Sequence, residues 1–403
     1  MKNRTQALIT FVGISLLMYA IVFGKDMYHN SRFVASTTHQ KNVLTSPAIH
    51  HTDNTQVVGN RIQIALILDT SNSMDGLINQ AKSQLWKIIN ELTRAHKDST
   101  AADISIALYE YGNDNLPVTK GYIRQVMPFN TDLDLLSEKL FALTTNGGSE
   151  YCGQVIQTSL NHLDWSESDS SLKIIYIAGN EGFNQGPVPY TNACSYAVKN
   201  NVVINTIYCG NYSSGIAEGW REGALQGQGM YHNIDSDQEV VLVSTPYDQT
   251  INQLNLELNN TYVHYGAKGK WNKDNQLRQD LNQDKISSAN SASRTLSKSS
   301  RLYYNGHWDL VDAYNTDNNI INNIDVQTLP DSLQTLEVNE LEVYVEEMNE
   351  KRISINRKIV ELGIKREEYI EHASDSLGKD NTLGSRMIKS LKRQASSKGF
   401  TFK

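Results

Sequence analysis

The sequence predicts an α/β domain with a doubly wound, Rossmann-like and mostly parallel sheet, followed by a mainly helical C-terminal region. Strand-like and helix-like segments alternate between residues 61 and 262, as expected for the crossover units of a parallel sheet. The first strand, residues 62–69, is an almost continuous aliphatic run, which is typical of a strand buried on both faces. Beyond residue 262 the segments become polar and mainly helical.

The strands and helices of the domain are expected in a regular order. The expected strands are apolar or alternating runs at residues 62–69, 103–112, 121–129, 172–179, 202–210 and 229–234. The expected helices are residues 74–96, 131–143, 150–163, 190–200, 215–226 and 245–262. Thr131 is the expected cap of the second helix, because its hydroxyl can accept from the first free backbone N–H groups. Ligands of such open sheets bind beyond the carboxyl ends of the strands, so functional residues are expected there.

The C-terminal region divides into two segments by composition. Residues 263–340 read as a polar, partly helical linker region with an aromatic island at residues 303–314, and its stretch 267–300 has little to bury apart from Trp271 and scattered leucines. Residues 341–403 are helical and coiled-coil-like, with an apolar seam at Val345, Met348, Ile355, Ile359, Leu362 and Tyr369. Arg352, Gly363 and Arg366 interrupt this seam. The pattern predicts that the chain can form a homo-oligomer through these helices.

The N-terminal segment predicts export. Lys2 and Arg4 precede an uncharged, apolar run at residues 7–24, so residues 1–24 are expected to be a signal anchor or a cleaved signal peptide. The run of roughly 18 residues is at the short end for a membrane-spanning helix. Positive charge at the N-terminus keeps that end inside, so the remainder is expected outside the cytoplasm, periplasmic or extracellular, and secreted if the segment is cleaved. Residues 25–60 are polar, without periodicity, and read as a tether.

Composition narrows the expected partners. The chain has 403 residues and a formal net charge of -7, so it lacks the basic balance of a dedicated nucleic-acid binder. The partners expected instead are a protein and, through the N-terminal segment, a membrane. The sequence contains no H-E-x-x-H motif, no nucleophile elbow and no phosphate-binding loop, so it is not expected to be an enzyme.

A candidate metal site lies where the first strand ends. Asp69, Ser71 and Ser73 form a D-x-S-x-S motif directly after the aliphatic run. Oxygen atoms two residues apart on one tight loop can converge on a hard cation, with Mg²⁺ the favoured ion. Each of these residues alone is also an ordinary helix cap, so the motif needs its context.

That context resembles the von Willebrand factor type A (vWA) family, over residues 61–262. In that family the D-x-S-x-S motif opens a metal-ion-dependent adhesion site (MIDAS), to which a second loop adds a threonine and a third loop adds an aspartate. The matching segments here are "TTNGGSEYCG", residues 144–153, and "IYIAGNEGF", residues 175–183. These segments, with "NTIYCG" and "GWREGAL", also look like an exported bacterial group that carries this domain.

Both later segments depart from the family pattern. Ser149 or Glu150 stands where the threonine is usual, and Asn180, with Glu181 beside it, stands where the aspartate is usual. Ser149 also suits the N-cap of a helix that begins at Glu150. The ligand set that the resemblance implies is therefore Asp69, Ser71, Ser73, Ser149, Glu150 and Asn180.

The three cysteines do not form a disulfide scaffold, because their number is odd. Cys209 ends an expected strand and Cys152 follows the second loop, so both are expected at the carboxyl edge of the sheet. Cys194 lies lower, in the middle of a helix. Cys152–Cys209 is thus the candidate disulfide, and three buried, unpaired thiols are the alternative.

The functional expectation is a binding module. An exported or membrane-anchored vWA domain would engage a protein partner at a divalent-metal site, with a carboxylate of the partner completing the coordination of the ion. The alternative is a scaffold protein that oligomerises through its C-terminal helices and carries the vWA domain as a passive head. A hydrolase that uses the ion is a third reading.

Overall fold

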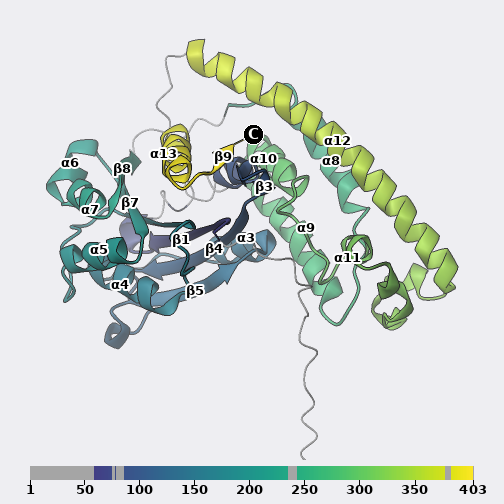
Figure 1. Cartoon of the computed structure of the whole chain (residues 1–403), viewed down its shortest axis with the longest axis horizontal. Helices are drawn as coiled ribbons and strands as arrows, with labels where there is room; N and C mark the ends of the chain where they lie inside the picture. Colours follow the sequence, from purple (N-terminus) through teal and green to yellow (C-terminus); the bar gives the residue numbers. More distant parts are fainter. Residues whose placement is uncertain (1–58, 75–77, 79–85, 235–242, 377–382, 403) are drawn as a thin grey trace, which may run out of the picture. The chain divides into compact units, whose positions relative to one another are not determined.

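The computed structural model describes residues 59–402, apart from residues 75–77, 79–85, 235–242 and 377–382, and the described residues belong to one compact unit (Figure 1). The apolar run of residues 7–24 and residues 25–58 of the tether lie outside the described residues. Within the described part of the chain, none of the helices combines the length and hydropathy that a membrane span requires.

The domain is built on one six-stranded sheet in the order β5-β4-β1-β6-β7-β8 (Figure 1). Its strands are β1 (Arg61–Asp69), β4 (Asp103–Tyr111), β5 (Ile123–Asn130), β6 (Leu172–Gly179), β7 (Val202–Cys209) and β8 (Gln228–Ile234). All neighbours pair in parallel except β4 and β5, which are antiparallel. The predicted mostly parallel sheet is confirmed.

The aliphatic run of β1 follows from its central place in this sheet. The strand pairs with β4 on one side and β6 on the other, and its side chains alternate between the two faces. Ile62 and Ile64 belong to one hydrophobic core, whereas Ala65 and Ile67 belong to the core on the opposite face. Because both faces are covered, nearly every position of β1 must be apolar.

Helices cover both faces. The helices of the domain are α3 (Leu133–Phe141), α4 (Cys152–His162), α5 (Tyr190–Lys199), α6 (Tyr212–Ala217), α7 (Trp220–Gln226) and α8 (Asp248–Asn259). Residues 86–92 are also helical, and η1 (Asn72–Met74) and η2 (Val118–Lys120) are short 3-10 turns. Side chains of α4, α5 and α7 build one core, and side chains of α3 and α8 help to build the other.

Two predicted helix caps are wrong. The cap of α3 is Asp132, whose carboxylate accepts hydrogen bonds from the backbone N–H groups of Asp134 and Leu135, so Thr131 has no such role. Helix α4 begins at Cys152 rather than at Glu150, and its first turn has no side-chain cap. Ser149 is therefore not the N-cap of this helix, and the stretch before Cys152 belongs to the loop.

The C-terminal region is mainly helical, as predicted. It contains α9 (Gly269–Ile286), α10 (Ser288–Lys298), α11 (Leu310–Thr316), η3 (Asn318–Asn322), η4 (Val326–Thr328), η5 (Asp331–Leu333), α12 (Val338–Ser376) and α13 (Leu383–Ser397). Its last strand, β9 (Thr401–Phe402), pairs with β2 (Ala95–Lys97), which pairs in turn with β3 (Thr100–Ala101) in a second, small sheet.

The polar helices α9 and α10 are packed onto the domain through buried ion pairs. Arg294 of α10 is 2.8 Å from a carboxylate oxygen of Asp134 on α3 and 2.6 Å from Asp280 on α9. Lys298 contacts Asp280 at 2.8 Å and also donates to two asparagine side chains of α8. The expectation that residues 267–300 have little to bury is wrong, because α9 and α10 bury paired polar groups.

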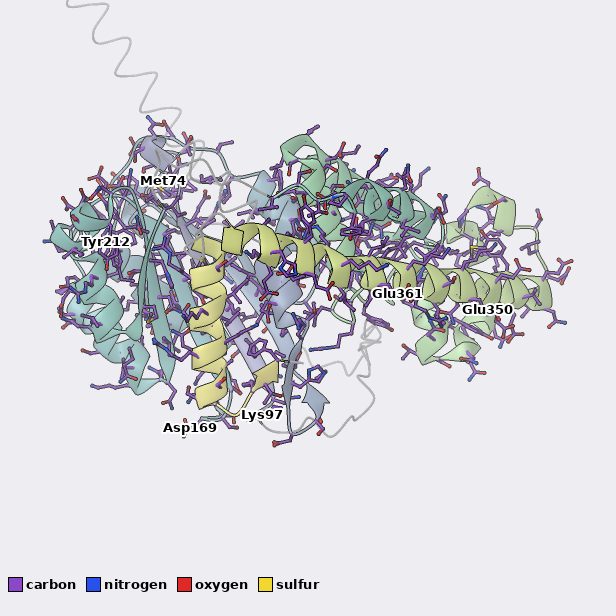
Figure 2. The ribbon with its side chains drawn as sticks, turned by 90° about the horizontal axis from the view of Figure 1, so that it is seen from above. Met74, Lys97, Asp169, Tyr212, Glu350 and Glu361 are labelled. Carbon is purple, nitrogen blue, oxygen red and sulfur yellow. The ribbon has the colours of Figure 1, made fainter. Side chains whose placement is uncertain are left out.

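The seam of α12 faces the chain's own helices (Figures 1 and 2, where Glu350 and Glu361 label this helix). Its apolar members Val345, Met348, Ile355 and Ile359 are buried, and α12 contacts α8, α10 and α11. The arginines that interrupt the seam are buried in ion pairs: Arg352 with Asp309 and Asp312, and Arg366 with Asp248. The coiled-coil-like pattern is therefore satisfied largely within the chain, although Tyr369 remains exposed.

Candidate metal centre

The candidate site lies at the carboxyl ends of the two central strands. Asp69 is the last residue of β1, and Asn180 directly follows β6, the strand paired beside it. The loop after β1 brings Ser73 to Asn180, with its hydroxyl donating to the side-chain carbonyl at 3.0 Å. The hydroxyls of Ser71 and Ser73 lie 3.0 Å apart. Met74, labelled in Figure 2, is the last residue of the 3-10 turn η1 in this loop. The pairing of parallel strands thus assembles the predicted oxygen ligands from two separate loops.

Asp69 is the most unusual group in this site. The residue is fully buried, and its Oδ1 accepts a 2.7 Å hydrogen bond from the backbone N–H of Ser71. Its Oδ2 is also buried and has no hydrogen-bond partner among the described residues. Burial raises the pKa of Asp69 to about 7, against the hydrogen bonds from Ser71, and the nearby carboxylates Glu150 and Glu181 raise it further. A buried, unpaired carboxylate oxygen is costly, so this atom is a natural place for a ligand.

Glu150 joins the same site from the second loop. Its side chain is buried and lies close to Asp69, and burial raises its pKa to about 7. The charges of Glu181 and Asp114 raise this pKa further. Of the two candidates for the usual threonine position, the structure therefore brings Glu150 into the site. Within the described part of the chain, none of the hydrogen bonds of the site reaches Ser149.

Gly112 lets the carboxyl groups of Asp69 and Glu150 approach each other, and it was not identified from the sequence. It follows β4 with a φ of +77°, and a Cβ placed on it would lie 2.6 Å from Oδ1 of Asp69 and 3.0 Å from Cγ of Glu150. A Cβ on Gly148 would similarly lie 2.3 Å from the carbonyl oxygen of Gly112. The second loop is thus pressed against the end of β4. A glycine directly after a strand, together with a glycine pair in the next loop, was the available signal in the sequence.

Asn113 anchors the second loop and was also missed. Its side-chain amide donates to the carbonyl oxygens of Thr144 at 2.9 Å and Thr70 at 3.3 Å. The backbone N–H of Asn146 donates to the same carbonyl of Thr70 at 3.0 Å. These bonds hold the loop that carries Glu150 against the loop that carries Ser71.

The donor set suits a hard cation. It combines the free oxygen of Asp69, the hydroxyls of Ser71 and Ser73, the side-chain carbonyl of Asn180 and the carboxyl group of Glu150, and Mg²⁺ prefers such oxygen ligands. The described residues include no group of three or more His, Cys, Asp or Glu side chains placed to hold a metal. Any ion here would therefore depend on hydroxyl and amide oxygens as well as on carboxylates.

The three cysteines are free and buried, so the candidate disulfide Cys152–Cys209 is not formed. Cys209 belongs to the hydrophobic core on one face of the sheet, and Cys152 belongs to the core on the other face. The sulfur of Cys152 instead lies 3.5 Å from the hydroxyl of Tyr111. Burial raises the pKa of both thiols well above the usual value, and raises that of Cys194 to about 12. These thiols are therefore poor nucleophiles.

Comparison with known proteins shows structural matches to vWA domains, whereas no protein-family model and no curated protein sequence matches the chain. The SpRpn10 VWA domain matches at 14% identity and a TM-score of 0.33, covering 44% of this chain and 90% of that chain. BatB from Bacteroides thetaiotaomicron matches at 15% identity and a TM-score of 0.33, covering 43% of this chain and 90% of that chain.

Proximal thread matrix protein 1 from the mussel byssus, in a structure described as having a zinc-occupied MIDAS motif, also matches. It has 15% identity and a TM-score of 0.33, and the match covers 45% of this chain and 44% of that chain. The strand order, the antiparallel edge strand β5 and the helices on both faces give this chain the vWA fold that the sequence predicted.

Proposed function

We propose that this chain is an exported or membrane-anchored binding module whose vWA domain engages a partner protein through a divalent cation, with Mg²⁺ favoured. The observation that carries the proposal is the unpaired, buried oxygen of Asp69, which lies beside two hydroxyls, an amide carbonyl and a second carboxyl group. When bound, the ion would supply a positive centre with a coordination position for an oxygen ligand of the partner. Domains with this fold are usually non-catalytic binding modules.

The residues that would hold the ion differ in charge from the family pattern in a compensating way. Asn180 is neutral where the pattern has a carboxylate, whereas Glu150 is acidic where the pattern has a neutral threonine. The two substitutions move one negative charge from the β6 side of the site to the second loop. The total charge offered to a cation is therefore kept, and this supports metal binding despite both departures.

The rim of the site constrains the partner. Glu181 and Asp114 are exposed near Glu150, and both raise its pKa by their charge. A carboxylate of the partner that approached the ion would pass these acidic side chains, so basic residues on either side of it would favour binding. The proposed partner is therefore a protein segment with one acidic residue flanked by basic ones.

Isothermal titration calorimetry of the full chain with MgCl₂ tests the proposal. We expect one ion per chain, and we expect Asp69→Ala to remove the binding. Exposed Asp274 on α9 provides the control, since Asp274→Ala changes the net charge equally without touching the site. Unchanged Mg²⁺ binding in Asp69→Ala would contradict the proposal.

The location outside the cytoplasm rests on the N-terminal sequence alone. Lys2 and Arg4 before the apolar run of residues 7–24 support export with the domain on the far side of the membrane. Protease added to spheroplasts should then digest the domain, and a protected full-length chain would contradict this location. Sequencing the N-terminus of the mature chain distinguishes an anchor from a cleaved signal.

One observation supports the alternative role, a scaffold protein that self-associates through its C-terminal helices. Ile353, Val360 and Ile364 of α12 are 52%, 48% and 58% exposed, and their spacing of seven and four residues places them on one side of the helix. This stripe, not the buried seam, would be the surface for self-association. Light scattering of the full chain at several concentrations, with Ile353→Lys and Ile364→Lys for comparison, tests it: a monomer at every concentration would exclude it.

A further inference from the structure

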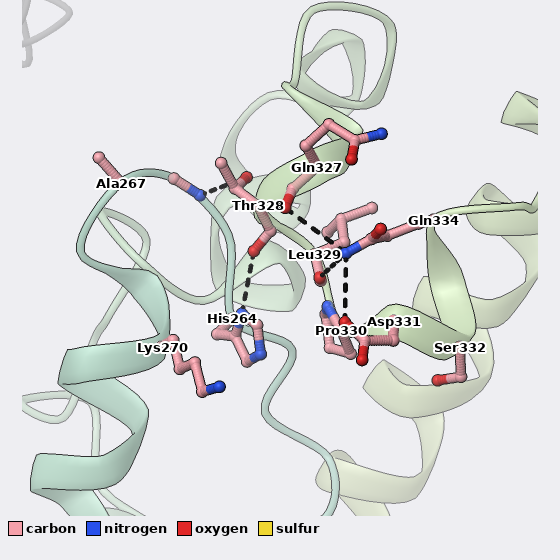
Figure 3. Close-up of a pocket in the computed structure, with 11 residues that line it drawn as sticks. His264, Ala267, Lys270, Gln327, Thr328, Leu329, Pro330, Asp331, Ser332 and Gln334 are labelled. Carbon is pink, nitrogen blue, oxygen red and sulfur yellow. Dashed lines mark hydrogen bonds between the residues drawn. The ribbon is translucent and has the colours of Figure 1, made fainter.

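A pocket of about 670 Å³ lies in the C-terminal region and shares no residue with the metal centre (Figure 3). One wall is formed by His264 and the start of α9, and the other by the segment from Gln327 to Gln334. Its volume falls within the roughly 300–1,000 Å³ that is usual for small-molecule sites. The pocket is therefore large enough for a ligand of several functional groups.

Hydrogen bonds between the two walls hold the pocket in shape. His264 Nδ1 lies 3.0 Å from the carbonyl oxygen of Thr328, and the backbone N–H of Gly266 donates to the hydroxyl of Thr328 at 2.8 Å (Figure 3). Within the second wall, Gln334 donates to the carbonyl oxygen of Leu329 at 2.9 Å. The walls are thus positioned before any ligand binds, which reduces the entropy lost on binding.

The two walls carry opposite charges that face the same space. Lys270 extends from the first turn of α9, and Asp331 lies on the opposite wall (Figure 3). In the part of the chain that the structure describes, no ion pair engages either side chain. Among the hydrogen bonds of the described residues, the Asp331 carboxylate accepts only a long one, of 3.4 Å, from Gln334, so it keeps acceptor capacity for a ligand. A pocket with a cation and an anion on opposite walls, neither of them in an ion pair, suits a ligand that carries both charges.

The start of α9 reinforces the cationic wall. This helix has 18 residues, and its N-cap residue, Lys268, makes no side-chain bond to the first turn. The N–H of Gly269 donates to the carbonyl oxygen of Gly266, but the remaining N–H groups of such a first turn favour a carboxylate, and Lys270 stands beside them. On the same wall, Nδ1 of His264 donates to the carbonyl oxygen of Thr328, since a carbonyl can only accept, and Nε2 remains for a hydrogen bond with a ligand.

We propose that this pocket binds a small zwitterion, the free α-amino and α-carboxylate groups of a short peptide. The carboxylate would lie against Lys270 and the start of α9, and the ammonium group would lie against Asp331. Pro330 also lines the pocket and would contact a short apolar side chain of the ligand. The metal centre is not required, so this proposal stands or falls separately from the binding function proposed above.

Calorimetric titration of the full chain with trialanine tests the proposal, with N-acetyl-trialanine and trialanine amide as capped probes. We expect one molecule of trialanine per chain and at least tenfold weaker binding of each capped peptide. Lys270→Gln should weaken trialanine about tenfold but leave trialanine amide unchanged, because the amide has already lost the carboxylate. Asp331→Asn should weaken trialanine about tenfold but leave N-acetyl-trialanine unchanged.

Matched controls lie outside the pocket. Lys285 and Asp274 are exposed on α9 and do not line the pocket, so Lys285→Gln and Asp274→Asn should bind trialanine as the unmodified chain does. Asp69→Ala should also leave trialanine binding intact. No binding of trialanine at millimolar concentration would overturn the proposal. Equal binding of the zwitterion and the capped peptides, or equal loss in the control variants, would overturn it as well.

Discussion

Ser73 donates a 3.0 Å hydrogen bond to the side-chain carbonyl of Asn180, and this bond joins the loops that follow β1 and β6. The hydroxyl proton of Ser73 therefore points to Asn180, so Ser71 is the donor in the 3.0 Å contact between the two hydroxyls, and Ser73 keeps one oxygen lone pair for another partner. The divalent ion that we propose for this site would contact both this oxygen of Ser73 and the unpaired oxygen of Asp69.

Asp69→Ala should abolish stabilisation of the chain by divalent ions. A ligand that binds only the folded state adds RT ln(1 + [L]/Kd), or about 2.7 kcal/mol when its concentration is a hundred times Kd. Melting temperatures measured with and without millimolar Mg²⁺, Mn²⁺ or Ca²⁺ would show this gain in the unmodified chain and in Asp274→Ala. The prediction fails if none of the three ions raises the melting temperature of the unmodified chain.

Mg²⁺ affinity should rise with pH across neutrality. The pKa values of Asp69 and Glu150 are each raised to about 7, so protons compete with the ion below that pH. Calorimetry at pH 6 and pH 8 would measure the change. Glu150→Gln should reduce the pH dependence, and an affinity that is the same at both pH values would contradict the assignment.

Without a metal, the same two groups should make the chain less stable as the pH rises. A carboxyl group with a raised folded-state pKa holds its proton in the folded chain after the unfolded chain has released it. The free energy of unfolding therefore falls between about pH 4 and pH 7, from the ordinary pKa values of 3.8 and 4.5 up to the raised values in the folded chain, and levels off above. Urea unfolding in EDTA across this range should show a smaller fall in Asp69→Asn than in the unmodified chain.

Asn180→Asp should bind Mg²⁺ more tightly, because it adds a negative charge beside the ion. Coulomb attraction of several kcal/mol at an effective dielectric near 20 is offset largely by desolvation of the new carboxylate. A net gain of about 1.4 kcal/mol would tighten binding tenfold. Glu150→Gln should have the opposite effect, and the double variant should resemble the unmodified chain. An affinity in Asn180→Asp that is equal or weaker would mean that Glu150 already supplies the charge that the ion requires.

Gly112→Ala should disrupt the metal centre, and Gly266 offers a matched control. Both glycines have a φ of +77°, but a Cβ on Gly112 would meet Asp69 at 2.6 Å, whereas a Cβ on Gly266 would meet nothing within 4 Å. Each alanine pays about 1–2 kcal/mol for its left-handed backbone. Only Gly112→Ala should also lose its thermal response to Mg²⁺, and an intact response in that variant would contradict the geometry of the site.

Arg352→Ala should destabilise the chain by about 3–5 kcal/mol, the usual loss when one partner of a buried ion pair is removed. Its guanidinium group is 2.6 Å from Asp309 and 2.7 Å from Asp312, and both carboxyl groups would lose their counter-ion. Arg357, exposed on the same helix, is the control, and Arg357→Ala should change the free energy of unfolding by less than about 0.5 kcal/mol. Equal urea midpoints for the two variants would refute this role of Arg352.

The sheet could be predicted because the burial of a strand shows in the pattern of residues within that strand. A strand covered on both faces must be apolar along its length, and β1 shows this pattern from Ile62 to Leu68. The end of that strand then located Asp69, and the order of the elements located Asn180. The choice between Ser149 and Glu150 as the site residue depended on a contact between distant parts of the chain. Gly112, 38 residues before Glu150, lets the Glu150 side chain approach Asp69, and no periodicity in the sequence indicates this contact.

The C-terminal helices were harder to predict for the opposite reason. Their buried surface is polar, and a polar side chain such as Arg294 has the same sequence signature whether it is solvated or paired with Asp134 and Asp280. Arg352 and Arg366 interrupted a helical seam in the sequence, but in the structure each of them anchors that seam. Burial of charge is visible only when the partner is known, and here the partners lie on other helices.

The contact between Arg294 and Asp134 joins residues that are 160 positions apart in the chain. A fragment cut after the last helix of the vWA fold would keep Asp134 and the apolar side chains Leu254 and Leu258 but lose what covers them. In evolutionary terms, this vWA domain is not expected to move between proteins as an independent unit. A gene rearrangement that transferred the domain would have to transfer the C-terminal helices with it, so the two parts are expected to have been inherited together.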